Sequence, residues 1–169
     1  MNTPTEKLKE LREKSGAGIM ACRNAYVEAE GDMSKALEIL KEQNLYIAEK
    51  RKERTTRQGL VEAYIHGEGR IGAMVEVNCE TDFVARTSEF KELAHLIAMQ
   101  VAAMNPLYVS KDDIPEDAEI DDVIDEICLL TQACIKDPAV TIQDLVTEVI
   151  GKTGENIQVS KIARFELGL

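Results

Sequence analysis

The first 47 residues show the hydrophobic spacing of three short helices. Apolar residues recur three or four positions apart in three successive stretches, and glycines at positions 16, 18 and 31 interrupt the pattern between them. Thr3 and Asp32 precede the first and third stretches and are expected to cap those helices. Three short helices predict a small bundle that buries little surface. Its apolar positions are Leu8, Leu11, Ile19, Cys22, Tyr26, Ala29, Met33, Ala36, Leu37 and Leu40.

The spacing of apolar residues changes from helical to alternating after residue 59. Alternation over Leu60–His66 and over Ile71–Cys79 predicts two strands joined by a glycine-containing hairpin, and Ile157–Phe165 predicts a third strand. Helical spacing returns at residues 88–104, 123–130 and 142–150. The polar stretch 48–58 shows no strand pattern, and we expect a linker that is helical in part.

These elements together predict an α+β fold in two parts. Residues 1–47 are expected to form an N-terminal three-helix bundle, and residues 48–58 a linker. Residues 59–169 are expected to form a core, in which helices cover one face of a small three-stranded antiparallel sheet.

The charge of the chain excludes one broad class of function. Its formal net charge is −11, whereas non-specific binding to nucleic acid depends on Lys and Arg that neutralise phosphates. Basic residues at 50–57 are offset by Glu49 and Glu53 and have no interleaved aromatic residues, so we interpret them as a solvated face. There is no apolar run of membrane length, and the four cysteines form no C-x-x-C pair. We therefore expect a cytoplasmic protein with buried, reduced thiols that binds neither nucleic acid nor membranes.

Three patterns resemble catalytic or cofactor-binding motifs but lack the context that these motifs need. Residues 67–72 match G-x-G-x-x-G, yet a strand follows where a dinucleotide site needs a helix. Residues 151–153 read Gly-Lys-Thr without the earlier glycine of a phosphate-binding loop. His66 and His95 have no cysteine or histidine at metal-ligand spacing. We expect no cofactor, no metal and no catalytic residue, with a thiol enzyme using Cys79 and His66 as an alternative.

Two apolar positions allow either a core role or a binding role. Phe83 stands at the junction between a predicted strand and a predicted helix, on the apolar stripe of neither. It either plugs the core or projects as a wedge toward a partner. Ile19 and Met20, beside the glycine-flanked loop, are likewise either core residues or part of an adaptable interface.

Several segments resemble the signature motifs of bacterial elongation factor Ts, in the same order along the chain. The segments are LREKSGAGIMAC (11–22), VNCETDFV (77–84), IKDP (135–138), IGKTGENI (150–157) and RFELG (164–168). This resemblance runs nearly from end to end. It implies a guanine-nucleotide exchange factor that binds the GTPase elongation factor Tu and speeds the release of GDP.

The resemblance also implies which residues contact the GTPase. The bundle is similar to the family's ubiquitin-associated-like module, which touches the GTPase domain. The later motif resembles the one whose Asp and Phe press on the GTPase and disturb its magnesium and phosphate site. The contact residues implied are Arg12, Ile19, Met20, Arg23, Thr81, Asp82, Phe83 and Val84.

One departure from the family pattern leads to a prediction about assembly. Longer members carry two related core subdomains, whereas this chain has room for one after residue 60. It resembles the short members, which act as homodimers, so we expect a homodimer through the core. A sheet covered on one face leaves the other bare, and some of Val75, Val77, Ile157 and Val159 are expected to be exposed there.

The alternative function is a ubiquitin-like or nascent-chain binding adaptor. Such an adaptor would use the bundle for binding, but it leaves residues 60–169 without a role.

Overall fold

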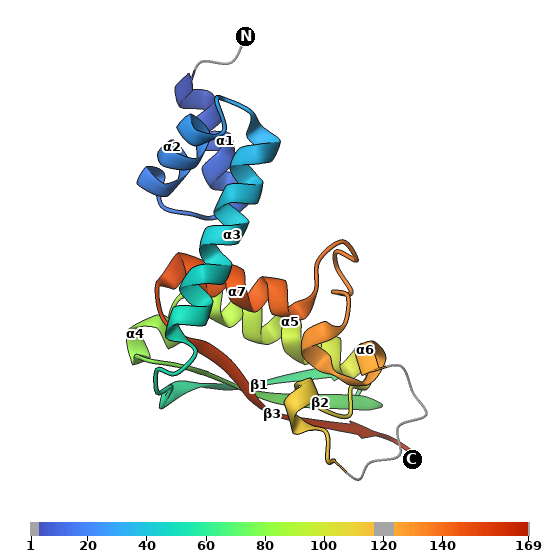
Figure 1. The fold of residues 1–169 in the computed structure, drawn as a ribbon. Coiled ribbons are helices and arrows are strands. Elements are labelled where there is room, and N and C mark those ends of the chain that lie inside the picture. Colours follow the sequence, from blue (N-terminus) through green and yellow to red (C-terminus); the bar gives the residue numbers. More distant parts are fainter. Residues whose placement is uncertain (1–3, 117–123, 169) are drawn as a thin grey trace. The chain divides into compact units, whose positions relative to one another are not determined.

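The computed structural model describes residues 4–116 and 124–168, and the chain divides into two compact units. The first unit contains the residues up to Arg54 together with Thr147–Asn156, and the second contains Thr55–Val146 and the residues from Ile157 onward. The expected α+β fold is confirmed (Figure 1). In these described ranges no helix is both long enough and apolar enough to cross a membrane.

The helices are α1 (Pro4–Ser15), α2 (Ile19–Glu28), α3 (Met33–Arg51), α4 (Asp82–Ala85), α5 (Ser88–Met104), α6 (Ile124–Ile127) and α7 (Ile142–Thr153), with 3-10 helices η1 (Lys111–Asp113) and η2 (Leu129–Thr131). The strands are β1 (Gln58–His66), β2 (Ile71–Cys79) and β3 (Ile157–Glu166).

Helices α1, α2 and α3 pack around a small core in the first unit. Its buried residues are Leu11, Ala17, Cys22, Ala25, Ala29, Ala36 and Leu40. Most are alanine or cysteine, so the helices approach closely while each side chain buries little apolar area.

The cap predicted for α3 is present in the structure. The Asp32 carboxylate accepts hydrogen bonds from the backbone N–H groups of Ser34 (2.8 Å) and Lys35 (3.1 Å). These bonds, that of Lys35 above all, hold the pKa of Asp32 below its ordinary value. Thr3, the predicted cap of α1, lies outside the described residues.

Helix α3 continues to Arg51, so residues 48–51 of the expected linker are helical. The end of α3 and the residues after it belong to the same unit as Thr147–Asn156. The side-chain amide of the buried Asn156 donates hydrogen bonds to the carbonyl groups of Lys52 (3.1 Å) and Arg54 (2.9 Å). A Cβ atom on Gly151 would lie 2.1 Å from Oδ1 of Asn44, so a side chain at position 151 would displace this neighbour. Residues from the two ends of the chain therefore complete one unit.

Within the described residues, the second unit contains one antiparallel sheet with the strand order β1-β2-β3. Strands β1 and β2 form the predicted hairpin and pair along their whole length. The hairpin turn has positive φ angles at Gly67, Glu68 and Gly69. The glycines that mimic a dinucleotide-binding motif thus serve the turn, because glycine adopts positive φ without a steric penalty.

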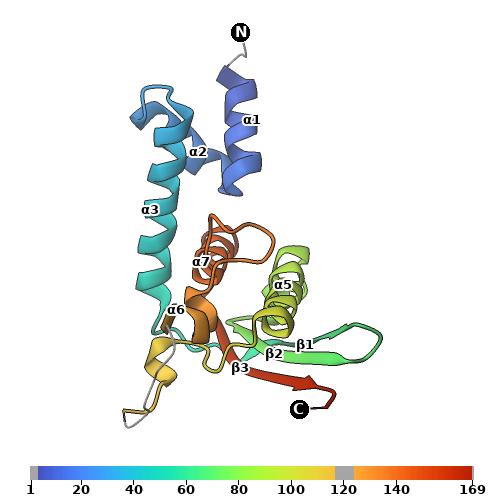
Figure 2. The same ribbon diagram turned by 90° about the vertical axis from the view of Figure 1, so that its right-hand side faces the viewer.

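Helix α5 lies across one face of this sheet (Figure 2). On the covered face Val75, Val77 and Ile157 are buried and Val159 is half-buried, so the expectation that some of these four residues form an exposed patch is wrong. The alternation along β2 and β3 places them all on the face that the helix covers. We call the opposite side the outer face. Four exposed apolar side chains lie on it: Val61, Ile65, Met74 and Phe165.

The fully buried Gln100 of α5 holds the chain segment that leads toward α7. Its Nε2 donates to Oε1 of Gln132 and to the carbonyl of Ala133, both at 3.1 Å, and its Oε1 accepts from the N–H of Ile135 at 2.9 Å. The helical spacing at 123–130 yields a shorter helix than expected, because α6 ends at Ile127; residue 123 lies outside the described residues. The chain continues from α6 into the 3-10 helix η2, and Gln100 anchors the residues that follow it.

We predict that Gln100→Leu lowers the free energy of unfolding by about 2 kcal/mol, because it leaves buried backbone and side-chain groups without their hydrogen-bond partner. Urea unfolding followed by circular dichroism measures the change. Gln58→Leu, at an exposed position of the edge strand β1, is the matched control and should change stability by less than about 0.5 kcal/mol. Equal stability of both variants would show that the Gln100 network is dispensable.

Candidate partner-binding surfaces

The expected contact residues of the first unit lie on exposed parts of α1 and α2. Arg12 is in the last turn of α1, whereas Ile19, Met20 and Arg23 are in the first two turns of α2. Ile19 is 51% exposed and Met20 is 59% exposed, so neither is a core residue. Helix α2 turns other positions, among them Cys22, toward the bundle core.

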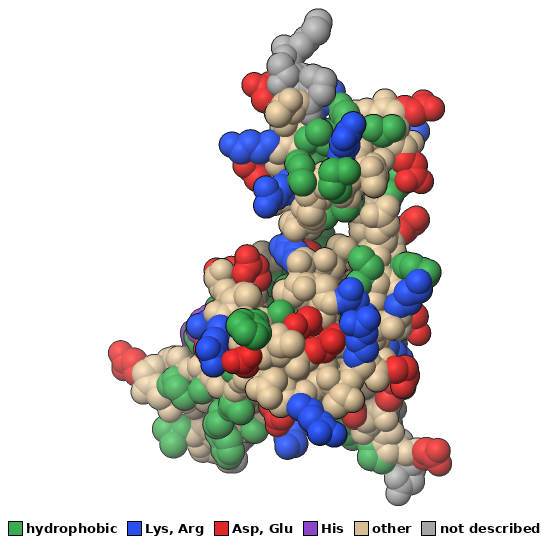
Figure 3. Space-filling model, turned by 90° about the vertical axis from the view of Figure 1, so that its left-hand side faces the viewer, with side chains coloured by type: hydrophobic (Ala, Val, Ile, Leu, Met, Phe, Trp, Pro, Cys, Tyr) green, Lys and Arg blue, Asp and Glu red, His purple; other side chains and the backbone are tan. Residues whose placement is uncertain are grey.

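Val27 extends this exposed face and was not found from the sequence. It is 69% exposed. It lies four residues after Arg23 and eight after Ile19, so the three share one face of α2. The spacing of Val27 from Ile19 and Arg23 could have identified this residue in the sequence. It was overlooked because the preceding residue, Tyr26, belongs to the apolar stripe assigned to the core. We call Ile19, Met20, Arg23 and Val27 the bundle surface. Figure 3 shows apolar and basic side chains gathered side by side over this part of the molecule.

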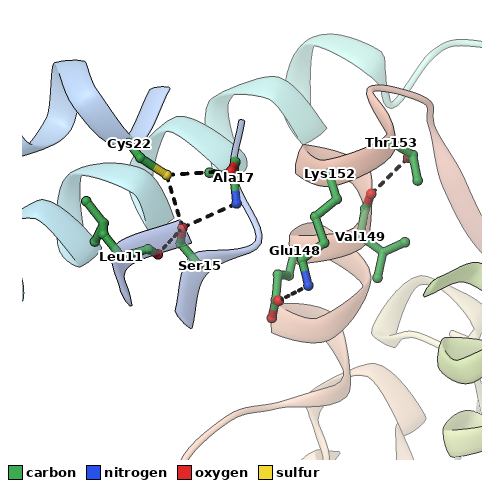
Figure 4. Close-up of polar contacts among 8 residues, drawn as sticks. All are labelled: Leu11, Ser15, Ala17, Cys22, Glu148, Val149, Lys152 and Thr153. Atoms are coloured by element: carbon green, nitrogen blue, oxygen red, sulfur yellow. Dashed lines mark hydrogen bonds and ion pairs between the residues drawn. The ribbon is translucent and has the colours of Figure 1, made fainter. Parts of the chain in front are cut away.

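A network around Ser15 fixes the loop that precedes the bundle surface (Figure 4). The Ser15 hydroxyl donates to the carbonyl of Leu11 at 2.7 Å and accepts from the N–H of Ala17 at 3.2 Å. The Cys22 thiol lies 3.7 Å from the same hydroxyl and donates to the carbonyl of Ala17 at 3.5 Å. Gly16 ends α1 with φ of +63° and donates to the carbonyl of Arg12 at 2.8 Å. The start of α2 is therefore tied to the end of α1, and this directs Ile19 outward.

The Gly-Lys-Thr segment belongs to the last turn of α7 and is packed within the first unit. Lys152 forms an ion pair with Glu148 at 2.5 Å, and the Thr153 hydroxyl donates to the carbonyl of Val149 at 2.8 Å (Figure 4). A Cβ atom on Gly16 would lie 1.6 Å from Cε of Lys152. The lysine side chain thus packs along the glycine loop instead of standing after a strand, as a phosphate-binding loop requires.

In the second unit, Thr81–Val84 overlaps the one-turn helix α4 (Asp82–Ala85), which lies between β2 and α5. Thr81 is its N-cap, and the Thr81 hydroxyl accepts from the N–H of Val84 at 3.5 Å. At the other end, the Thr87 hydroxyl donates to the carbonyl of Val84 at 2.8 Å and accepts from the N–H of Phe90 at 3.3 Å. The turn is thereby anchored to the start of α5.

Phe83 projects from this anchored turn. Its side chain is 80% exposed, so the interpretation as a plug of the core is wrong. Val84, in contrast, is 8% exposed and packs inward, which leaves it little surface to offer a partner. Beside Phe83, the carboxylate of Asp82 forms an ion pair with Arg86 at 2.9 Å. An aromatic ring and an oriented carboxylate thus lie next to each other on the surface.

The pairing of Cys79 with His66 as a catalytic thiol and base is wrong. The strand register places Cys79 opposite Gln58 and His66 opposite Ile71, at the two ends of the hairpin. At the rise of a β-strand these ends are about 26 Å apart. His66 instead contacts Tyr64, whose hydroxyl lies 3.1 Å from its Nδ1. Within the part of the chain that the structure describes, no group of His, Cys, Asp and Glu side chains is placed to hold a metal ion.

Comparison with known proteins agrees with the motifs in these two segments. A family model described as elongation factor TS matches residues 23–121. Curated proteins named elongation factor Ts from Caldanaerobacter subterraneus subsp. tengcongensis, Carboxydothermus hydrogenoformans and Thermotoga maritima are 47%, 45% and 45% identical to the chain. The alignments cover 96%, 97% and 99% of this chain and 96%, 88% and 98% of those proteins. The chain belongs to the elongation factor Ts family.

The family match covers both units. The residues matched by the family model include Arg23 in the bundle and the whole of Thr81–Val84. The alignment with the Caldanaerobacter protein runs over 191 residues, more than the 169 of this chain, so that relative carries residues without a counterpart here.

We predict that Ser15→Ala destabilises the bundle by about 1–2 kcal/mol, because the buried N–H of Ala17 loses its acceptor. Thermal unfolding followed by circular dichroism measures this change. Ser34→Ala, at an exposed position in the first turn of α3, removes the same atom and should alter stability by less than about 0.5 kcal/mol. A Ser15→Ala variant as stable as Ser34→Ala would mean that the network does not hold the loop.

Proposed function

We propose that the chain is a guanine-nucleotide exchange factor for elongation factor Tu. The bundle surface and the Thr81–Val84 turn bind the GTPase, and the turn promotes the release of GDP by disturbing the magnesium and phosphate site. The activity consists of binding alone, so the factor needs no catalytic residue of its own.

The observation that carries this proposal is the exposure of Phe83 on an anchored turn. Exposed aromatic side chains supply much of the binding energy of protein interfaces. Hydrogen bonds of Thr81 and Thr87 hold the turn on both sides, so the ring loses little conformational freedom on binding. Asp82 adds a negative charge beside the ring. This pair of side chains is suited to displacing groups that bind a cation in the GTPase.

Thermodynamic linkage explains how such binding releases a nucleotide. If the factor binds empty elongation factor Tu more tightly than the GDP-bound form, it must weaken GDP binding by the same factor. Displacement of magnesium ligands removes charge stabilisation from the phosphates of the nucleotide, which provides the physical coupling.

The bundle surface supports this mechanism as a docking site. It combines apolar side chains with the guanidinium of Arg23, and Met and Arg are enriched at protein interfaces. Because Met20 is flexible, it adapts to the shape of the partner. Docking by the bundle raises the local concentration of the Thr81–Val84 turn at the GTPase.

The homodimer that we expect from the sequence fits the outer face of the sheet. Exposed apolar side chains from all three strands lie there, whereas isolated apolar residues would be more usual on a monomer. In the same cross-strand row as Val61, Lys161 pairs with Glu76 at 3.2 Å and, as the main cause, lowers the pKa of Glu76. A twofold pair would bury the same apolar patch of both copies.

We predict that Phe83→Ala slows the release of GDP from elongation factor Tu by about 30-fold, equivalent to about 2 kcal/mol of lost transition-state binding. Stopped-flow fluorescence of labelled GDP bound to the GTPase measures the rate. Because Phe83 is exposed, the stability of the factor should change by less than about 0.5 kcal/mol.

The control for this prediction is Leu167→Ala, which removes another exposed apolar side chain of the same unit. It should leave the release rate unchanged. If the parent protein accelerates release and Phe83→Ala does so equally well, the wedge role is wrong. If the parent binds elongation factor Tu without accelerating release, the exchange function itself is wrong and an adaptor is favoured.

We also predict that Met74→Glu converts the dimer into a monomer, because it introduces a charge in the central strand of the outer face. Light scattering at micromolar concentration should give twice 18.8 kDa for the parent and 18.8 kDa for the variant. Val27→Glu, an equally polar change at an exposed position of the first unit, should remain dimeric. A monomeric parent would contradict the homodimer.

A further inference from the structure

Two buried thiols stand at corresponding places behind the two contact segments. Cys79 donates a hydrogen bond to the carbonyl of Thr81 at 3.1 Å, at the base of the turn that carries Phe83. In the other unit, Cys22 donates to the carbonyl of Ala17 at 3.5 Å, at the base of the loop before Ile19. Both thiols are fully buried. Cys79 ends a strand and Cys22 lies in a helix, so the similar placement of the two thiols does not arise from a shared local structure.

We propose that Cys79 is a positioning residue for nucleotide exchange: its thiol holds the carbonyl of Thr81, and thereby sets the direction of Phe83. This inference rests on the exchange function proposed above. Cys79 does not touch the GTPase and takes part in no covalent chemistry, because its sulfur is enclosed by the core of the second unit.

The position of Cys79 makes it a firm anchor. It is the last residue of β2, the central strand, where it is paired with Gln58 on one side and Ile157 on the other. Only Glu80 separates it from Thr81 along the chain. A donor that is fixed by two neighbouring strands therefore acts on the residue that starts α4.

Helix α4 depends on such an anchor because it is only one turn long. The carbonyl of Thr81 accepts from the N–H of Ala85 at 3.3 Å, and the thiol of Cys79 is a second donor to the same oxygen. The side-chain cap of Thr81 is long, at 3.5 Å, and the thiol bond at 3.1 Å adds a second hold on the first peptide of the turn. A rotation of this peptide moves the exposed ring of Phe83, and misplacement of a contact group by about 1 Å can cost up to 100-fold in rate.

The test compares four variants in the GDP-release assay over a range of factor concentrations. Cys79→Ala lacks the donor, whereas Cys79→Ser keeps one. Cys79→Val and Cys79→Thr form a second pair with a common branched shape suited to a strand, in which Thr alone has the donor. We expect the variants without a donor to lower the maximal rate about fivefold. The concentration at half-maximal rate should change little, because docking by the bundle is intact. The variants with a hydroxyl should recover at least half of the loss.

If Cys79 has a purely structural role, the hydroxyl variant of each pair should show no higher maximal rate than the variant without a donor. A buried hydroxyl is costlier than an apolar group of similar size, so Ser and Thr would then be no better than Ala and Val. Circular dichroism establishes that each variant is folded at the assay temperature, and the pair that folds decides the question. Cys134→Ala, which alters a buried cysteine elsewhere in the same unit, is the matched control and should keep the parental rate.

The outcomes separate this inference from the function on which it rests. A parent protein that fails to accelerate GDP release overturns both. A parent that accelerates release, with Cys79→Ala and Cys79→Val at the parental maximal rate, overturns the positioning role alone. Hydroxyl variants that are as slow as those without a donor also overturn the positioning role alone.

Discussion

The short connection between β2 and α5 is the constraint on which the exposed Phe83 depends. Strand β2 is paired on both edges, and α5 carries the fully buried Phe90 and Ile97, so neither end of the connection is free to move. The chain must change from strand to helix within residues 80–87. Val84 and Ala85 turn inward to meet the core, and the helical geometry of α4 then directs Phe83 away from it. The exposure of a large aromatic side chain is thus a consequence of how the core is packed around it.

The first unit also holds an exposed apolar segment in place, but it has a smaller core. Its core consists largely of alanine and cysteine, which pack closely but contribute little burial energy per residue. Polar contacts therefore have a larger share in fixing the geometry, as in the Ser15 network and the cap by Asp32. The glycine loop between α1 and α2 combines the conformational freedom of Gly16 with hydrogen bonds that remove this freedom again. This loop leads directly into α2, whose first two residues, Ile19 and Met20, are apolar and exposed.

Much of this fold could be predicted from the sequence, because apolar spacing reports which face of an element is buried. The bounds of α5 followed from spacing alone, as did the hairpin, although β1 begins two residues earlier than expected; the cap by Asp32 followed from residue type. The segment around Gln100 could not be predicted, since a buried glutamine in a helix looks like a surface residue until its partners, more than 30 positions away, are known. The exposed side of the sheet was also misjudged. Both faces carry apolar residues, and the alternation does not show that Met74 and Phe165 face away from α5.

The candidate contact segments follow from a resemblance to a family, whereas the exposure of their individual residues needed the structure. The sequence left Phe83 as either plug or wedge, and its solvent exposure in the structure excludes the plug. Val84 shows the converse case: it lies within the same motif but faces inward, so a motif alone does not distinguish a contact residue from the anchor that supports it. For an exchange factor this distinction matters. Under the proposed function, linkage requires tighter binding to the empty GTPase than to the nucleotide-bound form, and exposed, oriented groups such as Phe83 and Asp82 are available for contacts that differ between the two.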